Sequence, residues 1–156
     1  MGNAILVGFR SSGGDMSAVS VVDPFMEVAA AVELGINSIY RCIDDLPDGI
    51  EFEIIVLAVK PQIFATFQKN WAGKLSNDGM VISIMAGVAS DRIQASAGRA
   101  CDVVRCMPNI AAAVGRSVNV AFTTNPARKS DFHLLFSGAV NGRVKRAKPL
   151  LESRRI

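Results

Sequence analysis

An unbroken apolar run in the middle of the chain, EIIVLAV at residues 53–59, limits the possible folds more than any other segment. A strand with one face in water alternates apolar and polar residues, whereas a parallel strand covered on both faces is apolar throughout. Residues 53–59 therefore predict a parallel strand near the middle of a sheet. Pro61 follows directly and suits the first turn of a helix, whose apolar face is expected to continue to Leu75.

Strand-like and helix-like segments alternate on both sides of this run. Pro24 and Gly35 bracket a helix whose expected buried face is formed by Phe25, Val28, Ala29 and Val32. The expected strands are residues 18–23, 36–41, 79–85, 101–107 and 117–122, with a further short helix near 91–97. Such alternation predicts an α/β layer architecture built on a parallel sheet. The length of 156 residues fits a single domain.

The two ends of the chain depart from this pattern. The first residues, MGNAILVGF, are helix-like and have no strand before them, although a βαβ protein normally begins with one. Residues 143–156 hold six of the 17 Lys and Arg and one of the 14 Asp and Glu, a net charge of +5 against −2 for the rest. We expect this basic tail to be disordered. Nucleic-acid binding by the tail is a minor alternative, since the body has no basic stripe with interleaved aromatics.

The composition restricts where in the cell we expect the protein and which kinds of catalytic or metal site it can contain. No apolar run approaches the roughly 18 residues that cross a bilayer, and the N-terminus lacks a signal-peptide pattern, so we expect a cytoplasmic protein without a membrane segment. The three cysteines lack Cys-x-x-Cys spacing and are an odd number, which favours reduced core residues over disulfides or metal ligands. His133 is the single histidine, which leaves almost no material for a Ser-His-Asp or metal site.

Candidate ligand-binding residues lie where the expected strands end, because doubly wound sheets bind ligands at the carboxyl ends of their strands. Asp23 ends the first strand, where an acid can hydrogen-bond a ribose, and a cap before Pro24 is an equally good interpretation. The turn at residues 58–62 has a small residue and a proline that let the backbone approach a cofactor. On its own, this turn is better explained as an ordinary capped turn with a solvated lysine.

Two further turns follow the later strands. Residues 83–88, SIMAGV, contain small residues that permit close approach of a ligand to the backbone, although packing alone would also explain them. In residues 105–109, RCMPN, Asn109 can donate and accept hydrogen bonds at the strand end, and Pro108 fixes the turn. A plain strand terminator is the alternative interpretation of this second segment.

The order of these motifs is more specific than any one of them. VLAVKPQ at residues 56–62, SIMAGV at 83–88 and RCMPNIAAAVGRS at 105–117 closely resemble the cofactor domain of pyrroline-5-carboxylate reductase. The resemblance implies a Rossmann-like doubly wound parallel sheet at residues 1–125, which uses NADPH or NADH to reduce 1-pyrroline-5-carboxylate to L-proline. This reaction is the last step of proline biosynthesis. Residues 126–156 would be a divergent helix remnant followed by the basic tail.

The resemblance also implies roles for individual residues. The cofactor would bind at Gly2, Asp23, Ala58, Val59, Lys60, Pro61, Met85, Ala86 and Gly87, and the nicotinamide and substrate pocket would be bordered by Met107, Pro108 and Asn109. Residues 58–61 would line the ribose and phosphate, and residues 85–87 would lie under the nicotinamide. At the adenosine ribose, the charge of Asp23 would repel a 2′-phosphate, which favours NADH over NADPH. No catalytic residue and no metal site are assigned.

Two parts of the family pattern are absent from the sequence. The first strand and the earlier glycines of the phosphate-binding loop have no counterpart, so we expect weak dinucleotide binding and a damaged sheet. The strands beside the gap would pair directly or keep open edges. The family's C-terminal helical domain, which builds the homo-oligomer and much of the substrate site, is also absent, as in a truncated or frame-shifted product. A non-catalytic nucleotide-binding or interaction module is therefore the open alternative.

Overall fold

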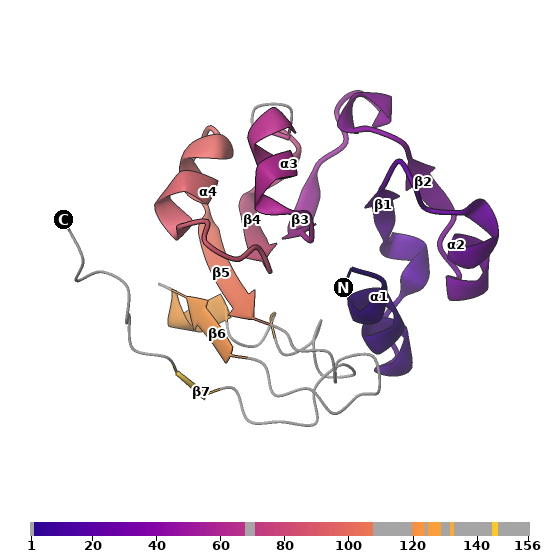
Figure 1. The fold of residues 1–156 in the computed structure, drawn as a ribbon, viewed down its shortest axis with the longest axis horizontal. Helices are drawn as coiled ribbons and strands as arrows, with labels where there is room; N and C mark the ends of the chain where they lie inside the picture. Colours follow the sequence, from indigo (N-terminus) through magenta and orange to yellow (C-terminus); the bar gives the residue numbers. More distant parts are fainter. Residues whose placement is uncertain are drawn as a thin grey trace.

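Helices and strands alternate along the chain in the computed structural model, which describes residues 2–67, 71–107, 120–123, 125–128, 132 and 145–146 (Figure 1). In chain order the helices and strands are α1 (Gly2–Ser11), β1 (Ser20–Val22), α2 (Val28–Leu34), β2 (Ser38–Tyr40), β3 (Phe52–Leu57), α3 (Pro61–Phe67), β4 (Leu75–Ser83), α4 (Ser90–Ser96), β5 (Asp102–Met107), β6 (Val120–Thr123) and β7 (Lys145–Arg146). None of the helices in this described part is long and apolar enough to cross a membrane.

The strands form two separate sheets. β1 pairs with β2 in a parallel two-stranded sheet, and the order β3-β4-β5-β6-β7 makes a second sheet in which β3, β4 and β5 are parallel. β6 runs antiparallel to β5 and parallel to β7. The prediction of an α/β fold with a parallel sheet is therefore confirmed. Of the two outcomes expected beside the gap, direct pairing does not occur, and β1 and β3 each keep one edge without a partner among the described strands.

The strand predicted from residues 53–59 is not in the middle of its sheet. β3 lies at the edge, with β4 as its only hydrogen-bonded neighbour among the described strands. An apolar sequence reports that both faces of a strand are covered, and it carries no information on whether another strand lies along each edge. β4 has a strand on each side, and its Val81 and Ile82 are fully buried.

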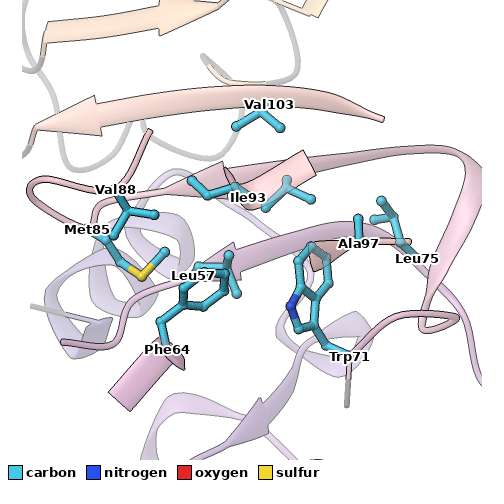
Figure 2. Packing of buried hydrophobic residues seen from close by; sticks show 10 residues of the cluster. Leu57, Phe64, Trp71, Leu75, Met85, Val88, Ile93, Ala97 and Val103 are labelled. Atoms are coloured by element: carbon cyan, nitrogen blue, oxygen red, sulfur yellow. The ribbon is translucent and has the colours of Figure 1, made fainter. Parts of the chain in front are cut away.

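Helices α3 and α4 cover one face of the larger sheet. The cluster on this face contains ten buried residues (Figure 2): Leu57, Phe64, Trp71, Leu75, Val81, Met85, Val88, Ile93, Ala97 and Val103. Pro61 begins α3 as predicted, but the helix ends at Phe67, and Leu75 belongs to β4. The apolar spacing to residue 75 thus correctly indicated burial, whereas the prediction of a helix to that residue was wrong.

Helix α1 covers the opposite face of the larger sheet and packs on the smaller sheet as well. Its Ile5 lies in a cluster with buried residues of β4 and β5, namely Met80, Ile82, Val104 and Cys106. The next residue, Leu6, and Phe9 pack instead with Val21 of β1 in a cluster around Met16, Ala31 and Ile36. One helix therefore joins the two sheets through neighbouring side chains.

Helix α2 begins later than predicted and buries a different face. It starts at Val28 rather than after Pro24, and Gly35 ends it in the left-handed conformation at φ 82°. All four residues of the expected buried face are exposed: Phe25, Val28, Ala29 and Val32. The face that packs holds Ala31, which is fully buried in the cluster shared with α1. This face is buried because α1 and Met16 lie on that side.

Most of residues 126–156 lie outside the described part of the chain, including His133, so the expected disorder of the basic tail stays a prediction. Two short elements are described within this segment: a 3₁₀ helix at Pro126–Arg128, and β7, which pairs with β6 through Lys145 and Arg146. No strand pattern in the sequence had indicated these two residues. The proposed boundary at residue 125 likewise stays a prediction.

Candidate nucleotide-binding site

The carboxyl ends of β3, β4 and β5 meet at one edge of the larger sheet. Leu57 lies opposite Ser83, and Ser83 opposite Arg105, in the parallel register. The turns that follow β3 and β4 therefore begin at the same level, whereas β5 continues for two more residues to Met107. The Ile84 N–H donates to the Leu57 carbonyl oxygen at 3.2 Å, which ties the first two turns together. This is the edge at which sheets of this type bind their ligands.

The turn after β3 contains four of the predicted cofactor-binding residues. Ala58 and Lys60 are exposed, and Val59 is half-buried against the cluster under α3. The Lys60 carbonyl oxygen accepts the N–H of Ile63 at 2.9 Å and of Phe64 at 3.1 Å, and Pro61 follows as the first residue of α3. The ordinary capped turn is thus present. Because Ala58 is small and exposed, the backbone at this edge is also open to a ligand.

The turn after β4 presents its backbone outward and one side chain inward. Ser83 is buried, and its hydroxyl accepts the Met85 N–H at 3.2 Å. The Met85 side chain is 3% exposed in the core cluster, so only its backbone is available to a ligand. Ala86 and Gly87 are exposed. Gly87 has φ 71°, and a Cβ placed on it would meet no atom of the described residues within 4 Å, so these residues leave the space above it open.

The first residue of α1 completes this edge. A Cβ placed on Gly2 would lie 3.5 Å from the Ala58 Cβ. The structure thus brings together Gly2 and the turn after β3, which are far apart in the sequence. The turn after β4 joins them through the hydrogen bond between Ile84 and Leu57.

Asp23 lies on the smaller sheet, directly after β1. Its backbone N–H donates to the Tyr40 carbonyl oxygen at 3.0 Å, and its carboxylate accepts the Phe25 N–H at 2.8 Å. The predicted helix cap is therefore wrong, because the residue before α2 is Glu27, and the Asp23 carboxylate caps the turn at Pro24 and Phe25 instead. A carboxylate has further lone pairs, so this hydrogen bond does not exclude a contact with a ribose.

Two arginines near these turns were not singled out from the sequence. Arg41 follows β2, and its Nη1 donates to the Pro24 carbonyl oxygen at 2.5 Å, which places a guanidinium beside the Asp23 turn. Arg105, in β5, has a buried Nε with no hydrogen-bond partner among the described residues. Inspection of every strand end for cations would have found Arg41, but the burial of Arg105 has no signal in the sequence.

The predicted substrate side of the site is only partly described. Met107 ends β5 at the same edge and is 65% exposed. Pro108 and Asn109 lie outside the described residues. Residues 58–60 and 84–87, with Gly2, therefore form the described candidate site, and Asp23 with Arg41 forms a separate polar corner on the smaller sheet.

The described cysteines are all free thiols. Burial raises the pKa of the Cys106 thiol to about 12, and burial, together with the nearby negative charge of Asp102, also raises the pKa of Cys101. Both groups stay protonated at neutral pH, which makes them poor nucleophiles. No group of three or more His, Cys, Asp or Glu residues that could hold a metal ion occurs within the described ranges.

Comparisons with known proteins agree with this geometry. No protein-family model matches the chain. A pyrroline-5-carboxylate reductase of Pasteurella multocida is 32% identical over 127 residues, which cover 80% of this chain and 46% of that protein. Solved pyrroline-5-carboxylate reductases of Coxiella burnetii and of Plasmodium falciparum superpose with TM-scores of 0.79 and 0.76 at 20% and 21% identity. They cover 94% and 96% of this chain, and 56% and 55% of those proteins.

Parallel strands between helical layers, with small exposed residues at their carboxyl ends, define a Rossmann-like domain of the NAD(P)-binding class. Within this class, the chain belongs to the pyrroline-5-carboxylate reductase family. It spans about half the length of the curated relatives that it matches.

Proposed function

We propose that the edge formed by Gly2 and the turns after β3 and β4 binds NADH or NADPH, and that the chemistry is reduction of 1-pyrroline-5-carboxylate to L-proline. The bound nicotinamide supplies a hydride to the imine carbon, and the imine nitrogen takes up a proton. The reaction would serve proline biosynthesis in the cytoplasm.

The main support for the proposal is that the turn after β3 and the turn after β4 begin at the same position along the sheet edge. Leu57 and Ser83 are opposite each other in the register, so Ala58 and the segment from Ile84 to Gly87 leave the sheet side by side. Both turns present small, exposed residues, and the open space above Gly87 has room for a planar group close to the backbone. This geometry fits a dinucleotide that lies across the edge of the sheet.

The relatives support the choice of reaction. The matched protein of Pasteurella multocida is a pyrroline-5-carboxylate reductase, and the structure of the reductase of Plasmodium falciparum has NADP bound. In this chain, the motifs VLAVKPQ and SIMAGV that carry the resemblance are the two turns at the carboxyl edge. Two of the three motifs that carry the resemblance therefore supply most residues of the proposed site.

The polar corner of the smaller sheet bears on the choice between the two cofactors. The carboxylate of Asp23 lies at the end of β1 and would meet a 2′-phosphate with like charge, which favours NADH. The Arg41 guanidinium beside it is already bonded to the Pro24 carbonyl oxygen and offsets this repulsion only in part. We therefore propose NADH as the preferred cofactor.

A direct test follows the absorbance of NADH and of NADPH with the purified 156-residue chain, with and without the cyclic imine. Isothermal titration with each oxidised and reduced cofactor measures binding separately from turnover. A full-length family reductase is the positive control for the substrate, and a cooperative thermal transition shows that the chain is folded.

Oxidation that depends on the imine supports the whole proposal. Saturable nucleotide binding without turnover would support the site but contradict the enzymatic part, and would favour the non-catalytic module. A folded chain that binds neither cofactor at millimolar concentration would overturn the proposed site as well.

A further inference from the structure

An apolar stripe on α2, whose spacing predicted burial, is exposed in the structure. Phe25 is 87% exposed, Val28 59% and Val32 61%, and Pro24 and Ala29 are exposed as well. Val28, Ala29 and Val32 share one side of the helix, and Pro24 and Phe25 lie in the turn that leads into it. Figure 1 shows α2 at the outer end of the molecule, beyond β1 and β2. We call these five residues the α2 stripe.

The size of the α2 stripe fits a contact between two proteins. Its exposed fractions correspond to about 450 Å² of apolar surface, and a patch of this size on a monomer often marks an interaction site. Two such stripes packed together would remove about 900 Å² from water, close to the roughly 1,000 Å² that a specific interface needs. The stripe is too small for a permanent interface, so we expect a weak, reversible contact.

The later parts of this chain are poor candidates for covering the α2 stripe. β6 pairs with β5, and β7 with β6, at the edge of the larger sheet opposite to β3. Phe132 is also buried against the larger sheet, in the cluster with Ile82 and Val104. Residues 143–156 hold six Lys and Arg, whose charges would lose water along an apolar surface. These placements favour a second molecule as the cover.

The charges at the two ends of α2 favour another copy of the helix in the opposite direction. Glu27 is exposed at the amino end. At the carboxyl end, the Nη1 of the exposed Arg10 donates to the Glu33 carbonyl oxygen at 2.5 Å, which holds a guanidinium there. An antiparallel pair brings Glu27 of each copy to Arg10 of the other, whereas a parallel pair places the two Glu27 side chains together. The Glu33 side chain lies about 100° around the helix from Val32, away from the stripe.

We propose that the α2 stripe is a dimerisation surface, on which a second copy of this chain packs with its α2 antiparallel. The contact is isologous, so both copies contribute the same residues. The Phe25 ring of one copy lies toward Val32 of the other, and the small Ala29 near the two-fold axis lets the helices approach closely. This surface differs from the C-terminal helical domain to which the resemblance assigns the family's homo-oligomer, and the contact does not depend on nucleotide binding.

Sedimentation velocity of the 156-residue chain over a wide range of concentrations tests the proposal. We expect a monomer–dimer equilibrium with a Kd on the order of 100 μM. Val28→Lys should weaken the dimer by about tenfold or more, because it brings two like charges together beside the two-fold axis. Ile63→Lys, at a 47% exposed position of α3, is the matched control and should leave the Kd unchanged. Phe25 is not substituted, because it lies beside Asp23 in the corner proposed for the cofactor.

Charge variants test the direction of the two helices. Glu27→Arg should weaken the dimer by about threefold or more, and adding Arg10→Glu to the same chain should restore the affinity. Circular dichroism shows whether each variant keeps its helices. Should a variant fail to fold, the unchanged chain still decides the question. Its Val28 and Val32 amide signals should shift between dilute and concentrated samples, and the signal of Ile93 in α4 should not.

Three results would overturn the proposal. A chain that stays monomeric at about 1 mM would show that no second copy binds the stripe. A dimer that Val28→Lys leaves unchanged, or that Ile63→Lys weakens equally, would show that the contact lies elsewhere. A dimer that Glu27→Arg weakens and the added Arg10→Glu does not restore would show that the helices do not pair antiparallel.

Discussion

Arg128 and Asp102 form an ion pair, with 2.7 Å between Nε and Oδ2, that connects the segment after β6 to the first residue of β5. The same carboxylate oxygen accepts a hydrogen bond from the Nδ2 of Asn125 at 2.9 Å, and the Arg128 Nη2 donates to the Asp78 carbonyl oxygen. The side chains of the pair are about one-quarter exposed, 27% and 25%. This network fastens the antiparallel end of the larger sheet to its parallel strands.

The first prediction concerns this network. Asp102→Asn removes the charge but keeps the shape, and should lower the free energy of unfolding by about 1 kcal/mol, because the pair is partly screened by solvent. Urea unfolding measures the change. Asp78→Asn is the matched control, since it removes a nearby exposed charge and leaves the backbone acceptor of Arg128 in place. An equal loss in both variants would show that net charge, not the ion pair, is responsible.

The second prediction tests the open space above Gly87. Gly87 and Gly49 both have a positive φ, 71° and 72°, and in the described part of the chain a Cβ added to either would meet no atom within 4 Å. Asn tolerates this conformation best among the residues with a side chain, so both Asn substitutions should cost similar stability. Only Gly87→Asn should weaken nucleotide binding, by about tenfold or more, because its side chain would fill the space proposed for the cofactor. Calorimetric titration of the two variants decides the matter.

The third prediction concerns the preference for NADH. Asp23→Asn keeps an oxygen that can accept the Phe25 N–H, so the turn should persist, while the charge that repels a 2′-phosphate is lost. We expect the affinity for NADPH to rise by about tenfold relative to that for NADH. The ratio of the two dissociation constants is the measurement. Asp48→Asn, an exposed acid before β3, should leave the ratio unchanged.

The fourth prediction concerns the order in which thiols react. Cys42 is exposed, Cys101 is half-buried, and Cys106 is buried with its pKa raised to about 12. At pH 8 only about one Cys106 thiol in 10⁴ would be ionised, and alkylation requires the thiolate. Timed iodoacetamide labelling with peptide mass spectrometry should therefore modify Cys42 first and Cys106 last. Early labelling of Cys106 in the folded chain would contradict the placement of its side chain in the core.

The fifth prediction concerns stability in acid. Hydrogen bonds from Cys42, with a further one from the Arg41 N–H, hold the pKa of the Asp45 carboxyl below its ordinary value of 3.8. The unfolded chain therefore takes up this proton first as the pH falls. The stabilisation of the folded state by these hydrogen bonds is complete above the ordinary pKa of the unfolded chain. It is lost as the pH drops through the lower pKa of Asp45 in the folded chain.

Asp45→Asn should accordingly flatten the fall in the urea midpoint below about pH 4. The neighbouring variant Asp44→Asn, which removes an acid from the same turn, should keep the slope of the unchanged chain. If the urea midpoints of both variants fall with pH at the same rate, the hydrogen bonds of Asp45 do not contribute to stability in acid.

The turns of the candidate site could be located from the sequence because their signals are local. The strand at residues 53–59, the proline that begins α3 and the small residues of the turn after β4 follow from neighbours in the sequence. The parallel register then brings such strand ends together in any fold of this type. Met85 shows the limit, because the motif placed it at the cofactor and the structure buries its side chain under α3.

Local signals in the amino-acid sequence were enough to establish the α/β class and the order of most elements. They also indicated that the proposed ligand-binding turns lie at the same edge of the sheet. Such signals suffice because propensity and apolar spacing act over a few neighbouring residues. Tertiary packing was needed to establish that β3 lies at an edge, that α2 buries Ala31 rather than Val28 and Val32, and that α1 joins two sheets. These outcomes depend on which distant segment covers each surface. An apolar pattern records that a side chain prefers burial, and the partner that buries it is fixed only when the whole chain has packed.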